Sequence, residues 1–311
     1  MIDLQLGVAG HHRCYSGILA GQRTLSSLAC AHLEASLTET RRGEWRHSES
    51  NANGKTLALL PTEFAELPAH ELCNSVEINA ELEAQTIRLR AVHTRQRSYF
   101  SNPAASFWVD ADGAQAELTH CSRNPELWLF GPVLILALAR LGVYCLHASA
   151  FLEGDAASVT VGNSGAGKSS LARAVSKQAG AQRLCDDITP ITLRAGKLYV
   201  LPRFPQLKLN AIDQGLPESV PLKRLILLNA AQLGSPSSHQ LLTQRGLFDA
   251  LTKHTVATRL FSDADTGVWW QRLPQIMAAV ADARCIRPAF DARAPESAML
   301  AALDNLDNLW A

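Results

Sequence analysis

The pattern of hydrophobic and polar residues changes near the middle of the chain. In the first part, Val76–Asn79 and Thr86–Val92 alternate apolar and polar residues, which is the period of half-buried β-strands. Ser106–Leu118 contains two further short runs around an Asp-Gly dipeptide, a typical hairpin turn. This pattern predicts a β-rich module over residues 1–122.

A helix is expected between the two parts. Asn124 and Pro125 are a cap residue and a first-turn proline, and Gly142 follows the last apolar residue. Pro132 should kink this helix because proline lacks an N–H donor. The segment also contains Arg140 and is shorter than the roughly 20 apolar residues that cross a bilayer, so it indicates a buried helix and no membrane partner.

From residue 143 onward, strands alternate with helices. Expected strands are Val143–Phe151, Ala157–Val161, Arg183–Cys185, Ile188–Leu193, Lys197–Leu201 and Pro221–Leu228. Expected helices are Lys168–Gln178, Gly246–Leu260, Thr266–Asp282 and Glu296–Leu309. This alternation predicts an α/β domain over residues 123–311, with helices covering a sheet.

Composition narrows the classes of partner. The chain has 47% hydrophobic residues, typical of a globular protein with a core, and 29 basic against 29 acidic residues. A balanced charge provides no electrostatic reason to bind nucleic acid. Seven cysteines without a CxxC pair favour neither a disulfide framework nor a zinc knuckle, and no signal peptide is visible. A reducing cytoplasm is therefore the expected location.

The strongest chemical signal is a P-loop, or Walker A, motif at Gly162–Ser169. It fits GxxxxGK[ST], and it follows an apolar strand and precedes a helix, as the motif requires. Its glycines let backbone N–H groups face phosphate oxygens, Lys168 reaches the phosphates, and the Ser169 hydroxyl suits Mg²⁺. The predicted nucleotide-binding residues are Gly162, Asn163, Ser164, Gly165, Ala166, Gly167, Lys168, Ser169 and Ser170.

Two carboxylates, Asp186 and Asp187, follow the expected strand Arg183–Cys185. Ligands of α/β sheets bind at the carboxyl ends of strands, so one carboxylate can hold a metal ion while the other accepts a proton. A surface turn is the alternative, because Asp favours turns. His147, on the strand before the P-loop strand, can orient the acidic pair or the acceptor, or be a core histidine.

Taken together, His147, the P-loop and the Asp pair resemble the HPr serine kinase/phosphorylase family, over about residues 140–230. The resemblance implies a P-loop kinase core of the phosphoenolpyruvate-carboxykinase type, with ATP and Mg²⁺. It also implies that Asp186 is the base towards a serine hydroxyl, that His147 supports it, and that Ser169 and Asp187 bind the metal.

The chain also departs from the bifunctional enzymes of this family. They carry Glu where Ser170 stands here, and their downstream Glu-Ile-Arg-Gly-Leu-Gly signature is missing. The Arg203-Phe-Pro-x-Leu-x-Leu pattern is more similar to HPr-kinase-related proteins, some of which phosphorylate a serine in a peptide or a small molecule. The acceptor is therefore expected to be a serine of a peptide, protein or small molecule.

Phosphoryl transfer also needs a further cation for transition-state charge. Arg203 is the catalytic candidate, with Lys208, Arg245 and Arg259 as others. The alternative function is a nucleotide-gated binding or scaffold protein with little or no transfer. The β-rich module, residues 1–122, is expected to recognise the acceptor or a partner, and a homo-oligomer is compatible with the sequence.

Overall fold

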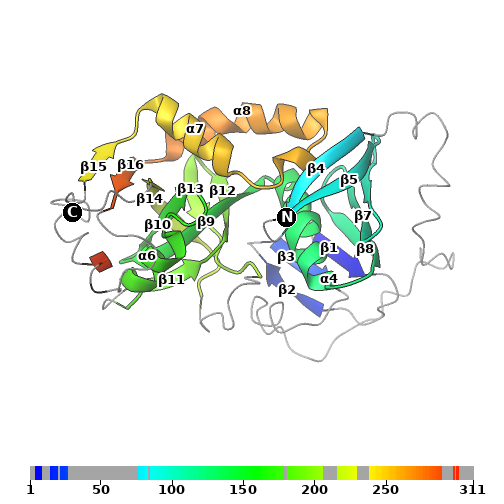
Figure 1. Cartoon of the computed structure of the whole chain (residues 1–311), viewed down its shortest axis with the longest axis horizontal. Helices are drawn as coiled ribbons and strands as arrows, with labels where there is room; N and C mark the ends of the chain where they lie inside the picture. Colours follow the sequence, from blue (N-terminus) through cyan, green and yellow to red (C-terminus); the bar gives the residue numbers. More distant parts are fainter. Residues whose placement is uncertain are drawn as a thin grey trace. The chain divides into compact units, whose positions relative to one another are not determined.

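The computed structural model describes residues 4–8, 15–19, 22–26, 76–82, 85–177, 181–205, 216–229, 238–288, 297, 299 and 300. The chain divides into two compact units. The first comprises residues 1–141 and 257–266, and the second comprises residues 142–256 and 267–311. The first boundary thus falls after Leu141 rather than after residue 122. Figure 1 traces the elements along the chain.

In its described part, the first unit is built on one eight-stranded sheet with the order β2-β3-β1-β8-β7-β6-β5-β4. The strands are β1 Leu4–Val8, β2 Tyr15–Leu19, β3 Gln22–Ser26, β4 Val76–Leu82, β5 Gln85–His93, β6 Arg97–Ser101, β7 Ala105–Asp110 and β8 Gln115–Cys121. From β4 to β8 each strand pairs antiparallel with the next. The predicted β-rich region and its Asp-Gly hairpin are therefore present.

The kinked helix belongs to this first unit. It consists of α4 Pro125–Trp128, the π-helical turn η1 Leu129–Val133 and α5 Leu134–Arg140, with non-helical torsions at Gly131. Its buried apolar side chains pack against β7 and β8. A Cβ on Gly113, in the β7–β8 turn, would lie 2.4 Å from the Ala137 carbonyl oxygen. This close packing places the boundary after the helix.

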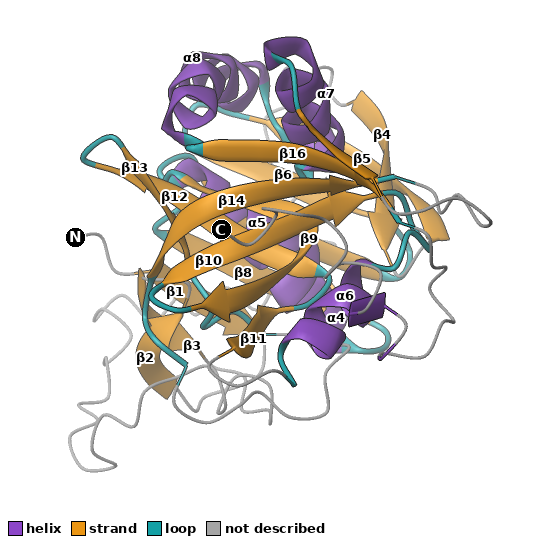
Figure 2. Cartoon of the chain, turned by 90° about the vertical axis from the view of Figure 1, so that its left-hand side faces the viewer, coloured by secondary structure: helices purple, strands orange, loops and turns teal. Residues whose placement is uncertain are grey.

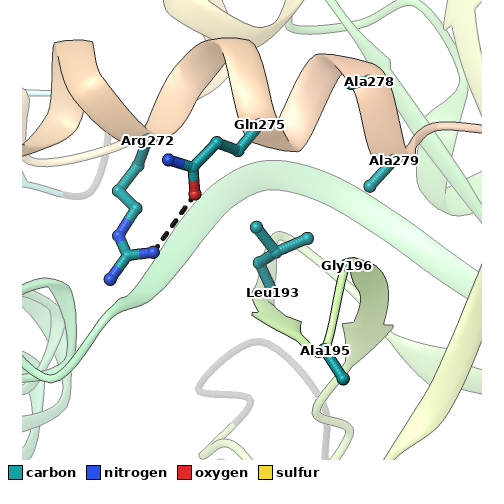
Figure 3. A pocket seen from close by; sticks show the side chains of 7 residues that line it. All are labelled: Leu193, Ala195, Gly196, Arg272, Gln275, Ala278 and Ala279. Carbon is teal, nitrogen blue, oxygen red and sulfur yellow. Dashed lines mark hydrogen bonds between the residues drawn. The ribbon is translucent and has the colours of Figure 1, made fainter.

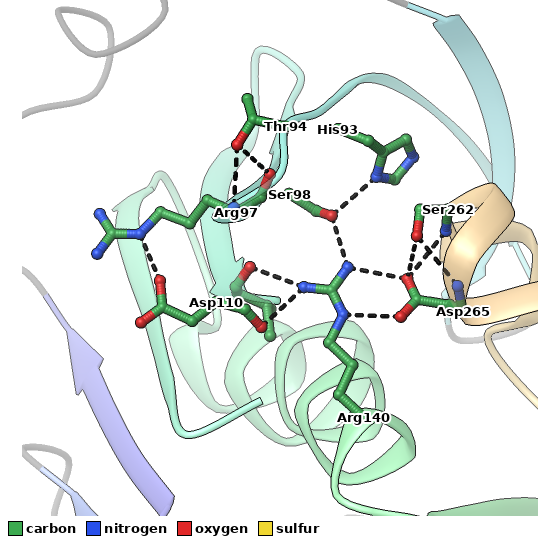
Figure 4. Close-up of polar contacts among 9 residues, drawn as sticks. His93, Thr94, Arg97, Ser98, Asp110, Arg140, Ser262 and Asp265 are labelled. Carbon is green, nitrogen blue, oxygen red and sulfur yellow. Dashed lines mark hydrogen bonds and ion pairs between the residues drawn. The ribbon is translucent and has the colours of Figure 1, made fainter. Parts of the chain in front are cut away.

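Arg140, at the end of α5, joins distant parts of the first unit (Figure 4). Its side chain is 4% exposed, and its guanidinium donates to both carboxylate oxygens of Asp265, at 3.0 and 2.9 Å. It also donates to the carbonyl oxygens of Val109 and Asp110 and to the Ser98 hydroxyl. A bidentate pair of this kind fixes direction as well as distance. The Arg140 network therefore holds residues 257–266 to the sheet of the first unit.

The second unit carries a mixed sheet with the order β10-β9-β12-β13-β14-β16-β15 among its described residues, and β11 pairs with β9. Its strands are β9 Val143–Glu153, β10 Ala156–Gly162, β11 Ala181–Cys185, β12 Ile188–Arg194, β13 Lys197–Val200, β14 Val220–Leu228, β15 Ser238–Leu241 and β16 Asp282–Arg287. β10, β14 and β16 are parallel neighbours. The predicted combination of sheet and helices is thus observed.

Helices cover this sheet. Helix α6, Lys168–Val175, buries Leu171 and Val175 against Phe151 of β9 and against apolar residues of β14 and β16. Helix α7, Gln244–His254, contacts β9 and β10. In Figures 1 and 2, α6 and α7 lie on opposite sides of these two strands. Both faces of β9 and β10 are therefore covered, which explains their nearly continuous apolar sequence.

The C-terminal elements differ in extent from the prediction. Helix α7 ends at His254 because Thr255 is extended and bridges to Leu146 of β9. A short 3-10 turn, η2, then spans Thr258–Leu260, and helix α8 spans Asp263–Ala279. The strands β15 and β16 were not anticipated. Of the predicted helix Glu296–Leu309, helical residues are described at 297, 299 and 300, and the rest lies outside the described residues.

Within the described part of the chain, no helix combines the length and the apolarity needed to span a membrane.

The Arg140 network predicts a large cost for removing its cation. The Arg140→Gln variant should lose about 3–5 kcal/mol of unfolding free energy, because Asp265, whose side chain is 13% exposed, loses its charged partner. Urea denaturation measures this loss, and hydrogen exchange of the β6 and β7 amides locates it. The control is Arg88→Gln, whose pair with Glu77 is largely exposed, and it should change stability by less than about 0.5 kcal/mol. Equal losses in the two variants would contradict this role of Arg140.

Candidate functional site

The glycine-rich loop follows β10 and runs directly into α6. Gly165 and Gly167 have φ angles of 77° and 97°, in the region that favours glycine. Gly162 is close to β14, because a Cβ there would lie 2.5 Å from the Leu228 carbonyl oxygen. The loop therefore depends on glycine at these positions, and it ends at the N-terminus of α6, where backbone N–H groups favour an anion.

Lys168 and Ser169 open α6 and differ in exposure. The Lys168 ammonium is buried and donates to the carbonyl oxygens of Gly162, at 2.9 Å, and Asn163, at 3.1 Å. Ser169 is exposed at the first helical turn. A positive charge thus lies against the loop, and a hydroxyl is accessible beside it.

Strand β9 brings the loop and the two aspartates together. Along one edge it pairs with β10, with Ala148 opposite Val161 just before the loop. Along the other edge His147 pairs with Ile188, and the Ala148 N–H donates to the Asp187 carbonyl oxygen at 3.1 Å. The loop therefore begins beside Ala148 on one edge of β9, and the aspartates lie beside the same residue on the other edge.

The two aspartates lie in a bend between β11 and β12, where Asp187 has a left-handed φ of 73°. The Asp186 side chain is 10% exposed, accepts a hydrogen bond of 2.8 Å from the Ser149 hydroxyl, and lies 3.8 Å from the Arg183 guanidinium. The Asp187 side chain is 28% exposed, and its Oδ1 is 3.7 Å from Nδ1 of His147. The bend gives the two carboxylates different surroundings.

His147 lies beside Asp187, with its Nδ1 3.7 Å from Oδ1 of that carboxylate. Its expected support of Asp186 stays a prediction. Ser149, which the sequence interpretation missed, donates a hydrogen bond to Asp186. The period of a β-strand could have suggested it, since residues 147 and 149 of one strand face the same side.

His254 is a second residue that was missed. It is buried at the end of α7, next to the bridge between Thr255 and Leu146, and the Val256 N–H donates to the Cys145 carbonyl oxygen. Burial lowers the pKa of His254 to about 4, and the charge of Lys168 acts in the same direction. No local sequence signal could have found it, because the segment that carries it is distant in the chain from the loop.

The candidate cations for the transition state are dispersed. Nε of Arg203 donates to the Leu216 carbonyl oxygen at 3.0 Å. Arg245 is exposed and pairs with Asp249, and Arg259, in the first unit, donates to the Asn79 carbonyl oxygen. Lys208 lies outside the described residues. These contacts give Arg203 a structural partner, and its catalytic role stays a prediction.

Two further findings concern a hollow in the second unit and possible metal-binding groups. A hollow of about 440 Å³ lies between the β12–β13 turn and α8, with Leu193, Gly196, Arg272 and Gln275 among its lining residues (Figure 3). It contains none of the predicted site residues. Among the residues that the structure describes, no group of three or more His, Cys, Asp or Glu side chains is placed to hold a metal ion.

Comparisons with known proteins show a distant likeness to solved structures and no match elsewhere. No protein-family model matches the chain, and no curated protein matches it. Among solved structures, the chain is similar to the Hpr(Ser) kinase/phosphatase from Coxiella burnetii, with 17% sequence identity and a TM-score of 0.22. That match covers 42% of this chain and 98% of the other.

The contact between Gly162 and β14 predicts that the Gly162→Ala variant displaces the loop. Its nucleotide affinity should fall at least about tenfold, since small displacements of positioned groups are costly. Calorimetric titration measures this affinity. The control is Gly154→Ala in the β9–β10 turn, where φ is 62° and a Cβ meets no atom within 4 Å. It should lose about 1–2 kcal/mol of stability from left-handed strain and keep its affinity. A Gly162→Ala variant with parental affinity would refute the role of this close approach.

The depressed pKa of His254 predicts a stability that depends on pH. An unfolded histidine titrates near 6.5, so between pH 6.5 and about 4 the unfolded chain binds more protons than the folded chain. Stability should therefore decrease as the pH falls through this window. The His254→Gln variant should show a smaller decrease in its urea midpoint, whereas His120→Gln, at an exposed position of β8, should follow the parent. The same slope in all three proteins would exclude His254 as a source of the effect.

Proposed function

We propose that the chain is an ATP-dependent kinase that transfers the γ-phosphate to a serine hydroxyl of a peptide, a protein or a small molecule. Its second unit is then a P-loop kinase core of the phosphoenolpyruvate-carboxykinase/HPr-kinase type. One observation carries the proposal: β9 has the glycine-rich loop on one edge and the Asp186–Asp187 bend on the other, at neighbouring residues. An anion site and two carboxylates at one place are the parts that phosphoryl transfer requires.

The residues at the loop fit a triphosphate. The N-terminus of α6 and the Lys168 ammonium supply positive charge, and the glycines leave the backbone N–H groups accessible. The Ser169 hydroxyl and the Asp187 carboxylate are oxygen donors, which Mg²⁺ prefers, and they would hold the ion. When bound, Mg²⁺ would neutralise charge on the phosphate oxygens. The exposure of Asp187 leaves room for the water ligands that Mg²⁺ usually keeps.

The two aspartates then have separate roles. Asp186 is mostly buried and is held by Ser149, so its carboxylate is pre-oriented to accept the proton of the attacking hydroxyl. His147 lies beside Asp187, so it would orient the metal-binding carboxylate. The acceptor would be selected by the first unit, in keeping with the role expected for the β-rich module.

A nucleotide-gated scaffold is the second candidate. The observation that favours it is the burial of Asp186 between Ser149 and Arg183, because a carboxylate held in this way can also be purely structural. In that case the chain would bind ATP and change conformation without transferring phosphate.

Separate Asn variants of the aspartates distinguish the two candidates. Asp187→Asn should weaken Mg²⁺-dependent ATP binding, and extra Mg²⁺ should partly restore it. Asp186→Asn should bind ATP nearly as the parent does and transfer phosphate about 10²-fold more slowly. Lys168→Ala should lose most of its ATP affinity, because it lacks the buried ammonium. Asp155→Asn, at the exposed β9–β10 turn, is the control and should match the parent.

The measurements are calorimetric titration with ATP at several Mg²⁺ concentrations and transfer from labelled ATP to serine peptides and small hydroxyl compounds. If both Asn variants transferred phosphate at the parental rate, the acidic pair would be structural. A parent that changes conformation with ATP yet labels no acceptor would favour the scaffold.

A further inference from the structure

Two buried hydroxyl groups lie side by side in the sheet of the second unit. Ser149 of β9 and Thr160 of β10 are paired across the antiparallel ladder, and both residues are 0% exposed. The Ser149 hydroxyl donates to Oδ1 of Asp186 at 2.8 Å. The Thr160 hydroxyl has no hydrogen-bond partner among the described residues. Of these two cross-strand partners, Ser149 therefore donates to the Asp186 carboxylate and Thr160 does not.

The engaged hydroxyl is held rigidly. Ser149 pairs with Thr160 of β10 on one edge of β9, and on the other edge it lies between the residues that pair with β12 and those that pair with β11, so its Cβ direction is set by the sheet. A hydroxyl that donates to a carboxylate forms a charge-assisted bond, which is stronger than a bond between neutral groups. Oδ2 of Asp186 lies on the side of Arg183, at 3.8 Å. The donor on Oδ1 and the cation on the side of Oδ2 together define the plane of the carboxylate.

We propose that Ser149 is a positioning residue that orients Asp186 for proton transfer, an inference that rests on the proposed kinase function. In the transfer, the O–H bond of the acceptor breaks and its proton moves to the Asp186 carboxylate. The acceptor oxygen forms a bond to the γ-phosphorus, and the bond from that phosphorus to ADP breaks with its electron pair leaving on ADP. Ser149 acts on this step through the orientation of Asp186, without contact with the acceptor.

The neighbouring Thr160 argues against a purely structural need for the Ser149 hydroxyl. The sheet accommodates a buried hydroxyl without a described partner at position 160, so pairing of β9 with β10 does not require polar side chains. An apolar residue at position 149 would keep the strand and remove the donor from the carboxylate. Thr160→Val is consequently a matched control, since it removes a buried hydroxyl from the adjacent position.

The experiment compares Ser149→Ala, Thr160→Val, Asp186→Asn and the Ser149→Ala/Asp186→Asn double variant in the full chain. Ser149→Ala should transfer phosphate about tenfold more slowly at saturating ATP and keep the parental ATP affinity. Thr160→Val should transfer at the parental rate, with an equal or higher urea midpoint. The double variant should be no slower than Asp186→Asn alone, because Ser149 acts through that carboxylate.

Urea unfolding of the same four proteins is the readout that does not depend on activity. The Ser149→Ala substitution should lower the unfolding midpoint more in the parental chain than in the Asp186→Asn chain. The difference between these two effects measures the hydrogen bond between Ser149 and Asp186. If Ser149→Ala does not fold, Ser149→Cys replaces it, because the thiol keeps the volume and is only a weak donor.

The outcomes separate this inference from the function on which it rests. A Ser149→Ala variant with the parental rate, alongside a slow Asp186→Asn variant, would overturn the role of Ser149 and leave the kinase proposal intact. Additive rate losses in the double variant would overturn it as well, since Ser149 would then act elsewhere. A parent and a Thr160→Val variant that both label no acceptor would overturn the kinase function together with the positioning role.

Discussion

The pairing of β9 along both of its edges is the constraint on which the candidate site depends. β10 occupies one edge and β11 followed by β12 the other, so the strand fixes two distant segments against each other by backbone hydrogen bonds. A shift of this register by one residue would turn His147 and Ser149 to the opposite face of the sheet. Because helices pack on both faces, such a shift would also disrupt the contacts of the apolar side chains of β9 with α6 and α7, so the register is strongly specified.

Charge burial in the second unit follows from this pairing. Lys168 and Asp186 are both largely buried, each with hydrogen bonds to groups of the rigid frame: loop carbonyls for the lysine and the Ser149 hydroxyl for the aspartate. A buried charge is tolerated only when it is paired or hydrogen-bonded, so these groups keep fixed positions. Fixed positions suit the phosphoryl transfer proposed above, because catalysis of that reaction consists mainly of positioning and electrostatic stabilisation.

The first unit also depends on a buried charge that is held by hydrogen bonds. Its sheet must hold residues 257–266, which are remote in sequence, and Arg140 does so through five hydrogen bonds to Asp265, Ser98 and two carbonyl groups. Burial lowers the pKa of neighbouring His93, and the positive charge of Arg140 acts in the same direction. The bidentate geometry to Asp265 makes this cation specific to arginine, because lysine has no fork of donors.

Local sequence determined the parts of this protein whose residues are contiguous: the β10–loop–α6 segment, the β7–β8 hairpin, the kink at Gly131 and the acidic pair after β11. In each of these segments, the local conformation is determined by hydrophobic periodicity, glycine or proline within a few neighbouring residues. Only the tertiary structure decided that helix α5 belongs to the first unit, that α7 stops at His254, and that the Ser149 hydroxyl donates a hydrogen bond to Asp186. These outcomes depend on which strands pair and in which register. Strand pairing and register are determined by burial and hydrogen bonding over the whole unit, so no short stretch of sequence is enough to predict them.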